Sequence, residues 1–590
     1  MIAREDALAA LRANEFDVVV VGGGITGAGV ALDAATRGYS VALIERGDFA
    51  CGTSSRSSKL VHGGLRYLQS FDLGLVREAL LERRLMVHLA SHIVHPLALV
   101  VPAFGGARPD RMLGVGLNLY DVMAVDRSRL RRRRGAPGAA GAAEDSDEEA
   151  WSPARHRVIG GEEVLELLPA LAGRKPTGGY LFYDCQTDDV RLVFTVLGEA
   201  ERFGAVCANR VGAHTLIERD GRAEGVHARD EESGEEIELR APNVINATGV
   251  WADELRPGEL HDVAEVPRIR PSRGTHVTLS HAALPLSGGA IVPAPGGRHI
   301  FALPWLGSTL IGTTDNDYDG PLEHVPPSAE DVDYLLGAVN ELFGSGLGRR
   351  DVRGAFAGVR PLISVGDGKK SVDISRRAEL YETSSGMLTI TGGKLTTWRR
   401  MAKLTVDRMV EREAREAPCH THEVPLGQPV DAARLPRVAG VDEDAYAALA
   451  GRYGHAAHEV LAIAAEQPRL AAPILAGHPD LMAEVALAAR REQARTIADV
   501  LLRRTRLGLL AADRLVGREH LAERDPDGPP AALAASDAVR RVAEVLAREL
   551  GWEEARSERE VGRFAAEAAA EGLLVGGPDA GERRPAGVRQ

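Results

Sequence analysis

Apolar runs alternate with a glycine-rich turn between Val18 and Glu45. Val18–Val21 is a continuous run of valines, which is typical of a parallel strand buried on both faces. An alanine-rich stretch follows the glycines and stops at Gly38, as expected for a helix that packs on a sheet. A second apolar run then ends in the acid Glu45. The pattern predicts a strand, a turn, a helix and a second strand.

The turn between these elements has the spacing GxGxxG, at Gly22, Gly24 and Gly27. In dinucleotide-binding folds the first glycine permits the tight turn, the second lets a pyrophosphate approach the backbone, and the third lets the helix pack closely. The N–H groups at the helix N-terminus favour a phosphate, and Glu45 is placed to accept hydrogen bonds from ribose hydroxyls. A chance glycine-rich loop is the alternative, but the flanking strand, helix and acid favour a dinucleotide site.

A later strand distinguishes between the two common dinucleotides. The segment NVINATGVWAD, at Asn243 to Asp253, is an apolar run that ends in Ala247, Thr248 and Gly249. In two-dinucleotide-type flavoproteins, small residues on such a strand lie against the FAD pyrophosphate, where a bulky side chain would block it. A plain structural strand is the alternative. Together with the first glycine turn, the segment favours FAD over NAD. The two segments also predict an α/β fold, which is α+β when the whole chain is considered.

The composition changes after about residue 400, where Ala, Leu, Glu and Arg dominate and strand-like runs are few. This composition predicts a helical domain. A chain of 590 residues exceeds what one hydrophobic core usually serves, so several units are expected. We therefore predict an oxidoreductase region at 1–400, a linker at 401–424, a helical domain at 425–570 and a disordered polar tail at 576–590.

The charge pattern argues against nucleic-acid binding, because the formal net charge is −13 and phosphate neutralisation requires a clustered basic surface. Residues 127–150 begin basic and end acidic, which predicts a mobile insertion. This insertion is either a contact for anionic lipid or a solvated loop, and its self-neutralising charge favours the loop. The N-terminus lacks the pattern of a signal peptide, and no run approaches the ~18 apolar residues of a membrane span, so a cytoplasmic location is expected.

The segment GTSSRSSKLVHGGLRYL, at Gly52 to Leu68, is crowded with hydroxyls, glycines and cations. With it, the sequence resembles the FAD-dependent, quinone-linked glycerol-3-phosphate dehydrogenase family of the D-amino-acid-oxidase-like flavoprotein superfamily. The resemblance covers nearly the whole chain. The other matching segments are LFYDCQTDDVRLV, RGTHVTL, FALPWLGSTLIGTTDNDYDGP, FAGVRPL, DISRRAEL, TGGKLTTWR and LLRRTRLGLL.

The resemblance implies a Rossmann-like FAD-binding domain interleaved with a β-rich substrate domain and followed by the helical domain. It implies noncovalent FAD, oxidation of sn-glycerol 3-phosphate to dihydroxyacetone phosphate, and electron delivery to a membrane quinone, ubiquinone or menaquinone. Peripheral attachment to the inner face of the membrane follows, and the oligomeric state stays open, with a homodimer among the alternatives. The implied FAD-binding segments are about 16–90, 180–262 and 352–400, and the substrate-domain segments about 91–179 and 263–351.

The resemblance also assigns a cationic substrate site, which suits a phosphomonoester because that group is close to a dianion at neutral pH. The implied catalytic residues are Arg66, His276, Arg360 and Lys394, with Tyr67 and Arg376 added for substrate binding. Lys394 or Arg360 would stabilise the developing alkoxide, and His276 is the group best matched to proton removal, although the base is not decided. For each residue taken alone, a surface ion pair or a structural histidine is the alternative.

The implied cofactor-binding residues come from four parts of the chain. They are Gly22, Gly24, Gly27, Glu45, Ser54, Ser55, Ser58, Lys59, Leu60, His62, Gly63, Gly64, Ala247, Thr248, Gly249, Gly393, Lys394, Leu395 and Thr396. Trp398 stands where relatives commonly have a tyrosine. Three other functions stay open: a glycerol-3-phosphate oxidase that uses oxygen, a noncatalytic FAD-binding scaffold, and an amino-acid oxidase of the same superfamily.

The four cysteines are too widely spaced for a disulfide framework or a zinc pattern, so we expect reduced thiols. Cys51 allows two interpretations, a thioether to the flavin or a small buried neighbour of the cofactor, and the second is favoured because relatives usually have a small residue there. Cys419, His420 and His422 lack further ligands at a recognisable spacing. No metal site is predicted.

Overall fold

The computed structural model describes residues 1–64, 72–105, 111–124, 155–258, 262–364, 377–517 and 535–576. Of the predicted site residues, Arg66, Tyr67 and Arg376 lie outside these ranges. The predicted insertion at 127–150 and the tail from residue 577 also lie outside them.

The predicted dinucleotide unit forms the centre of a six-stranded sheet. β1 lies between β2 and β11, parallel to both, so that the glycine turn and the late strand are neighbours as predicted. The strands in order across the sheet are β18 (Ala378–Glu382), β19 (Leu388–Gly392), β11 (Asn243–Asn246), β1 (Val18–Val21), β2 (Val41–Glu45) and β7 (Val206–Asn209).

Both faces of this sheet are covered, because the valines of β1 belong alternately to two hydrophobic cores. One face packs on α2 (Ile25–Thr36), α8 (Asp189–Arg202) and α10 (Trp398–Arg412). The other face packs on α1 (Arg4–Ala13) and on a three-stranded sheet of β8 (Val211–Arg219), β9 (Arg222–Asp230) and β10 (Glu236–Arg240). The sheet is therefore buried on both sides, as the continuous apolar runs predict.

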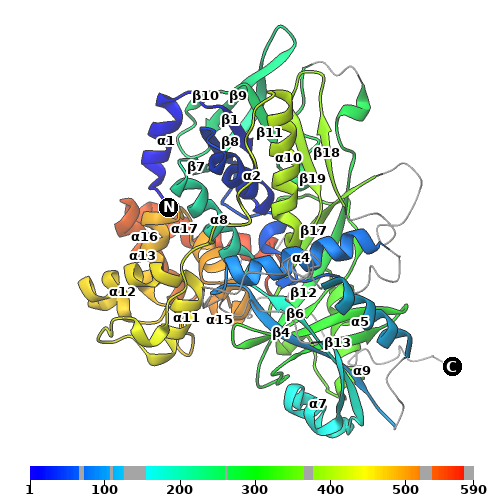
Figure 1. The fold of residues 1–590 in the computed structure, drawn as a ribbon. Helices are drawn as coiled ribbons and strands as arrows, with labels where there is room; N and C mark the ends of the chain where they lie inside the picture. Colours follow the sequence, from blue (N-terminus) through cyan, green and yellow to red (C-terminus); the bar gives the residue numbers. More distant parts are fainter. Residues whose placement is uncertain are drawn as a thin grey trace, which may run out of the picture.

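A ten-stranded sheet forms the second layer of the molecule (Figure 1). β6 and β17 belong to it because they pair antiparallel with β4 and β12, although their residues fall in segments expected to bind FAD. Its strands are β3 (Leu60–Val61), β4 (His95–Ala103), β5 (Arg157–Gly160), β6 (Gly178–Gln186), β12 (Ile269–Ser280), β13 (Gly289–Ala294), β14 (Arg298–Trp305), β15 (Ser308–Gly312), β16 (Asn316–Asp317) and β17 (Val352–Ile363). The helices near this sheet are α4 (Leu73–Leu89), α5 (Arg111–Ala124), α7 (Gly161–Leu167) and α9 (Ala329–Phe343).

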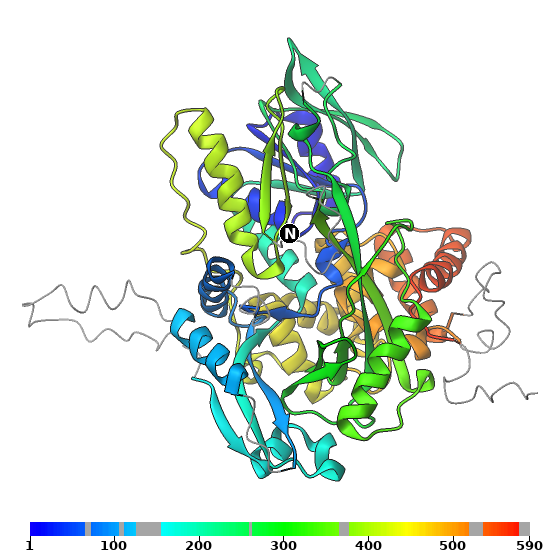
Figure 2. The ribbon, with the colours of Figure 1, turned by 90° about the vertical axis from the view of Figure 1, so that its right-hand side faces the viewer.

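The C-terminal region is helical, and its core includes Trp305, Leu310 and Phe356 of the large sheet. It therefore packs directly on that sheet, as Figures 1 and 2 also show. Its helices are α11 (Glu443–Tyr453), α12 (Ala457–Glu466), α13 (Met482–Arg491), the π-helix η11 (Asp499–Arg504), α14 (Leu507–Leu510), α15 (Ala512–Leu515), α16 (Asp537–Leu550) and α17 (Glu554–Ala570).

Helix α10 begins at Trp398 and ends at Arg412, so the first part of the segment predicted as a linker is helical. Its Trp398 is 1% exposed and lies against α2, where a Cβ on Gly29 would come within 2.6 Å of the indole ring. The glycine in α2 and the large aromatic ring in α10 thus let the two helices pack closely.

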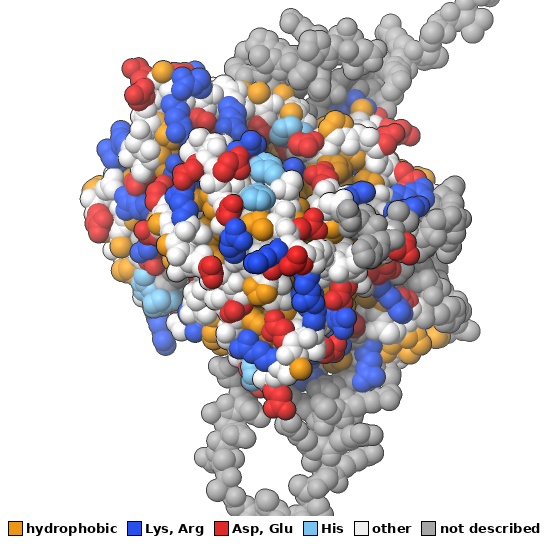
Figure 3. Space-filling model, turned by 90° about the horizontal axis from the view of Figure 1, so that it is seen from above, with side chains coloured by type: hydrophobic (Ala, Val, Ile, Leu, Met, Phe, Trp, Pro, Cys, Tyr) orange, Lys and Arg blue, Asp and Glu red, His pale blue; other side chains and the backbone are white. Residues whose placement is uncertain are grey.

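The surface of the molecule carries both signs of charge. Seen from above, basic and acidic side chains are interspersed (Figure 3). Among the described residues, no helix has the length and apolar composition needed to cross a membrane.

Candidate functional site

A cavity of about 1020 Å³ is lined by both sheets and by the helical region. At one end lies the glycine turn. Gly22 has φ +113°, and a Cβ there would lie 2.6 Å from the Ala247 carbonyl oxygen. Gly27 packs on the same turn, because its Cβ would lie 1.9 Å from the Gly22 carbonyl oxygen. A Cβ on Gly24 would meet the Ser54 hydroxyl at 3.0 Å. The turn therefore leaves an open cradle of backbone at the N-terminus of α2.

Glu45 fixes the shape of this cradle. Its carboxylate accepts the N–H of Gly23 and the N–H of Gly47, each at 2.7 Å. Burial raises the pKa of Glu45, and these two N–H donors oppose that rise. Because a carboxylate has about four acceptor positions, Glu45 can hold the turn and still accept ribose hydroxyls.

The loop of residues 47–58, here called loop 47–58, connects the cradle to the large sheet. The Ser54 hydroxyl accepts the N–H of Ile25, the first residue of α2, at 2.9 Å. Thr53 donates its hydroxyl to the Val359 carbonyl of β17 at 2.6 Å. Ser58 Oγ lies 2.9 Å from His276 Nε2. Loop 47–58 therefore forms one wall of the cavity between the two sheets.

Two predicted cofactor residues near this loop face away from the cavity. Ser55 is buried, and its carbonyl accepts the Lys59 ammonium at 2.6 Å. Lys59 is fully buried and also donates to Asp189 at 2.7 Å. Burial, reinforced by the charge of Arg506, lowers the pKa of Lys59 to about 7. The Ser55 carbonyl and the Lys59 ammonium therefore stabilise loop 47–58 on the side that faces away from the cavity.

Another part of the cavity wall joins the segment after β3 to the short helix at Leu395–Thr397. The His62 N–H donates to the Thr396 hydroxyl at 3.0 Å, and that hydroxyl donates to the His62 carbonyl at 3.2 Å. Gly63 packs away from the cavity, because a Cβ there would lie 2.5 Å from Leu80 and 2.6 Å from the Tyr120 hydroxyl.

Arg360 is held over the large sheet by the adjacent strand β12 and by the link between β15 and β16. It pairs with Ser272 of β12 in the antiparallel register, and its guanidinium passes over Gly274, where a Cβ would lie 2.6 Å from Nη2. Nη2 donates to the Thr314 carbonyl at 3.1 Å, and Nη1 donates to Asp315 at 3.3 Å. The guanidinium is therefore oriented before any ligand binds.

His276 lies on the same face of β12 as Gly274, two residues along the strand. It is 2% exposed, and its ring stacks on Phe356 with centroids 4.8 Å apart. Burial lowers the pKa of His276 well below its usual value, and the charges of Lys59 and Arg360 lower it further. The imidazole is therefore neutral near pH 7, and it is a weaker base than an ordinary histidine.

The cavity brings together most of the predicted residues that the structure describes. Among these, the ones in its wall are Gly22, Gly24, Glu45, Ser54, Ser58, Leu60, His62, Ala247, Thr248, Gly249, His276, Arg360, Gly393, Lys394, Leu395 and Thr396. The described ones outside its wall are Gly27, Ser55, Lys59, Gly63 and Gly64.

The helical region also contributes to the cavity, which the sequence reasoning missed. Thr496, Asp499 and Arg503 reach it from the segment around η11, and Arg563, Glu567 and Glu571 reach it from α17 and its end. A signal was present in LLRRTRLGLL, where Arg503, Arg504 and Arg506 interrupt an apolar run. Charges in a buried run indicate ion pairs or a site.

The cysteines take no part in a bridge. Cys51 Sγ lies 3.9 Å from Glu45 Oε1, at the cradle end of the cavity, and burial raises the pKa of its thiol to about 12. Cys419 Sγ lies 3.2 Å from the Thr421 hydroxyl, and His422 pairs with Glu423. Within the described ranges, no group of three or more metal-ligating side chains is arranged to hold an ion.

Known proteins match this chain along nearly its whole length. The sequence model of the family described as FAD dependent oxidoreductase matches residues 17–408, and that described as C-terminal domain of alpha-glycerophosphate oxidase matches residues 419–520. Glycerol-3-phosphate dehydrogenase 2 of Mycobacterium tuberculosis is 36% identical over 580 residues, which cover 96% of this chain and 91% of that protein. The chain belongs to the FAD-dependent glycerol-3-phosphate dehydrogenase family.

Two further members of this family support the assignment. Glycerol-3-phosphate dehydrogenase 1 of M. tuberculosis is 38% identical over 524 residues, covering 86% of this chain and 94% of that protein. The X-ray structure of the glycerol-3-phosphate dehydrogenase from Bacillus halodurans, complexed with FAD, superposes with a TM-score of 0.71 at 26% identity, covering 97% of this chain and 98% of that one. The protein is thus an oxidoreductase with FAD as its cofactor, and the glycine cradle with Glu45 beside it fits the dinucleotide.

Proposed function

We propose that this flavoenzyme oxidises sn-glycerol 3-phosphate to dihydroxyacetone phosphate and passes the electrons to a membrane quinone. The observation that carries the proposal is that Arg360, Lys394 and His276 share one cavity with the dinucleotide cradle. Cations in the wall of a flavin site suit a phosphorylated substrate, whereas a binding scaffold would not require them. The names of the relatives support the same substrate.

When bound, FAD supplies a hydride acceptor at N5 of its ring system. The backbone at Gly22 and Gly24 and the N-terminus of α2 would hold the pyrophosphate, and Glu45 would hold the ribose. Residues 393–396, which also line the cavity, would contact the ring system. Cys51 touches Glu45, at the ribose end, so we propose that the flavin is held without a thioether.

Arg360 would bind the phosphate and thereby fix the C2 carbon of the substrate toward the flavin. Lys394 would stabilise the negative charge that develops on the C2 oxygen. His276 would accept the hydroxyl proton, directly or through the Ser58 hydroxyl that lies 2.9 Å from Nε2. The lowered pKa of His276 keeps the ring in the neutral form that this role requires, although it also reduces the proton affinity of the ring.

Anaerobic bleaching of the bound flavin tests the substrate. Glycerol 3-phosphate should bleach the flavin absorbance, whereas amino acids should leave it unchanged. An unreactive flavin would support a noncatalytic scaffold, and bleaching by amino acids alone would support an amino-acid oxidase.

The electron acceptor is tested separately with the reduced enzyme. A dehydrogenase should reoxidise rapidly with a soluble quinone and slowly with oxygen. Rapid peroxide formation in air without quinone would instead support an oxidase.

Attachment to the membrane would be peripheral, through a local surface. Deletion of residues 127–150 should leave flavin content and dye-linked activity intact, because a self-neutralising loop is not needed by the cavity. Cosedimentation with vesicles, with and without anionic lipid, measures attachment. Unchanged binding supports a solvated loop, and a loss on anionic vesicles alone would assign lipid contact to the insertion.

A further inference from the structure

The helical region contacts loop 47–58 at three points, partly at the cavity wall and partly behind it. The first contact is at Asp48, which is 2% exposed. Its carboxylate accepts Arg503 Nε at 2.5 Å, and it accepts Arg504 Nη1 at 2.5 Å and Nη2 at 2.9 Å. Because the carboxylate and both guanidinium groups are buried, removal of one partner would leave a poorly compensated buried charge.

The second contact is at the backbone of the loop. The Ser55 carbonyl accepts Arg506 Nη2 at 3.0 Å, in addition to the Lys59 ammonium. Arg506 is fully buried and also donates to Asp189 Oδ1 at 3.0 Å. Lys59 donates to the other oxygen of that carboxylate. The Ser55 carbonyl is therefore held jointly by Lys59 and by one arginine from the helical region.

The third contact is at Arg56, which pairs with Glu571 at the end of α17 at 2.8 Å. The three contacts lie at both ends of the stretch from Cys51 to Ser54, which forms part of the cavity wall. Within this stretch, Ser54 binds the first N–H of α2, beside the dinucleotide cradle.

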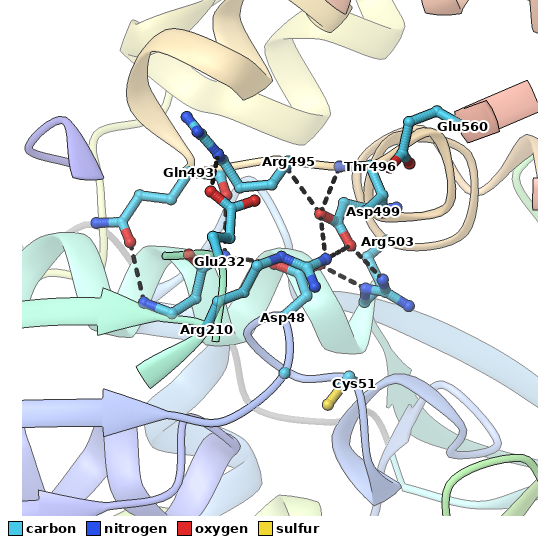
Figure 4. Close-up of polar contacts among 12 residues, drawn as sticks. Asp48, Cys51, Arg210, Glu232, Gln493, Arg495, Thr496, Asp499, Arg503 and Glu560 are labelled. Carbon is cyan, nitrogen blue, oxygen red and sulfur yellow. Dashed lines mark hydrogen bonds and ion pairs between the residues drawn. The ribbon is translucent and has the colours of Figure 1, made fainter. Parts of the chain in front are cut away.

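Asp499 holds the arginines themselves in place (Figure 4). It accepts Arg503 Nη2 at 2.6 Å and Arg210 Nη2 at 2.8 Å, and Arg210 follows β7 of the FAD-binding sheet. The backbone N–H groups of Arg495 and Thr496 donate to the same carboxylate at 2.8 and 2.9 Å. The network thus joins the helical region, loop 47–58 and the FAD-binding sheet.

We propose that the helical region is a clamp on loop 47–58 that sets how tightly FAD is held. Docking of the helical region and binding of FAD would then stabilise each other, and such coupling is reciprocal by linkage. Arg504 and Arg506, both described residues, lie outside the cavity wall. These two side chains therefore act on the FAD site indirectly, and their contacts with Asp48 and the Ser55 carbonyl connect them to the loop.

The test compares flavin release from holoenzymes with Arg504→Gln and Arg506→Gln. In Arg504→Gln, Asp48 keeps its contact with Arg503. Release is followed by the rise in flavin fluorescence after dilution, and we expect release about 5- to 150-fold faster than from the wild type, the usual range of coupling between sites. Asp513→Asn is the matched control, because it weakens the Arg353–Asp513 pair between β17 and α15, away from loop 47–58.

A second readout separates the clamp from general destabilisation. In the wild type, FAD should slow hydrogen exchange in the helices between residues 443 and 570, and this protection should shrink in both arginine variants but not in Asp513→Asn. If Arg504→Gln does not accumulate as folded holoenzyme, Arg504→Lys, which keeps the charge, takes its place. The proposal would be overturned if the variants at both positions release flavin within twofold of the wild-type rate. It would also be overturned if hydrogen exchange in the wild type is equal with and without FAD.

Discussion

Replacement of Arg360 by alanine tests whether this side chain binds the phosphate. The guanidinium is 22% exposed and is held by Asp315 and Thr314, so its position is set in advance. A charge-assisted hydrogen bond contributes about 1.5–3 kcal/mol, which corresponds to a roughly 10- to 150-fold loss of kcat/KM for glycerol 3-phosphate. Local structure should persist, because Asp315 still accepts the Ser272 hydroxyl at 2.6 Å.

Steady-state assays with glycerol 3-phosphate and with glycerol measure the effect on each substrate. Glycerol lacks the phosphate, so its kcat/KM should fall much less. Arg353→Ala on the same strand is the control, since this half-exposed residue pairs with Asp513 outside the main cavity and should change kcat/KM less than about twofold. An equal proportional loss on both substrates would refute the role of Arg360 in phosphate binding.

Three further substitutions test the site and the core. Gly24→Val should purify without flavin absorbance, because the added side chain would meet the Ser54 hydroxyl and occupy the pyrophosphate cradle; normal flavin content would contradict this role. Burial lowers the pKa of His276 below 6.5, so wild-type kcat/KM should fall when the pH drops through that lower value and protonates the ring; this limb should be absent from the pH profile of His276→Asn, whereas the limb from protonation of the substrate phosphate, at about pH 6, should remain. Trp398→Ala should reduce the free energy of unfolding by about 3–5 kcal/mol in urea titrations, and a loss below about 1 kcal/mol would contradict close packing of α10 on α2.

The local elements of the FAD-binding sheet were predictable because their signals are local. The valine run of β1 and the glycine at position 22 with φ +113° follow from short patterns. The strand β11 was also predicted, because the small residues that follow it suit the same cofactor. Strand pairing over long distances was harder: β6 and β17 are readable as strands, but nothing in their own residues specifies that they join the large sheet.

The site residues also divide into those that local patterns predict and those that depend on long-range pairing. His276 and Arg360 were assigned by resemblance, since no spacing in the sequence indicates that β12 and β17 pair and place both side chains beside one cavity. Ser55 and Lys59 belong to a block whose other residues line the cavity, yet they point away from it. Lys59 adopts φ +60°, and the direction of side chains in such irregular backbone follows no period. The pairing of Asp48 with Arg504 depends on tertiary structure alone.

The order of strands also determines when the cofactor site can be completed during synthesis. β1 and β2 leave the ribosome together with the glycine turn, but the residues that flank the turn on the other side belong to β11, where Val18 pairs with Asn243. At about 5–20 residues per second, that partner is made roughly 10 to 50 s later. The nascent chain must keep an apolar strand edge unpaired throughout this interval, which exposes this stage of folding to aggregation.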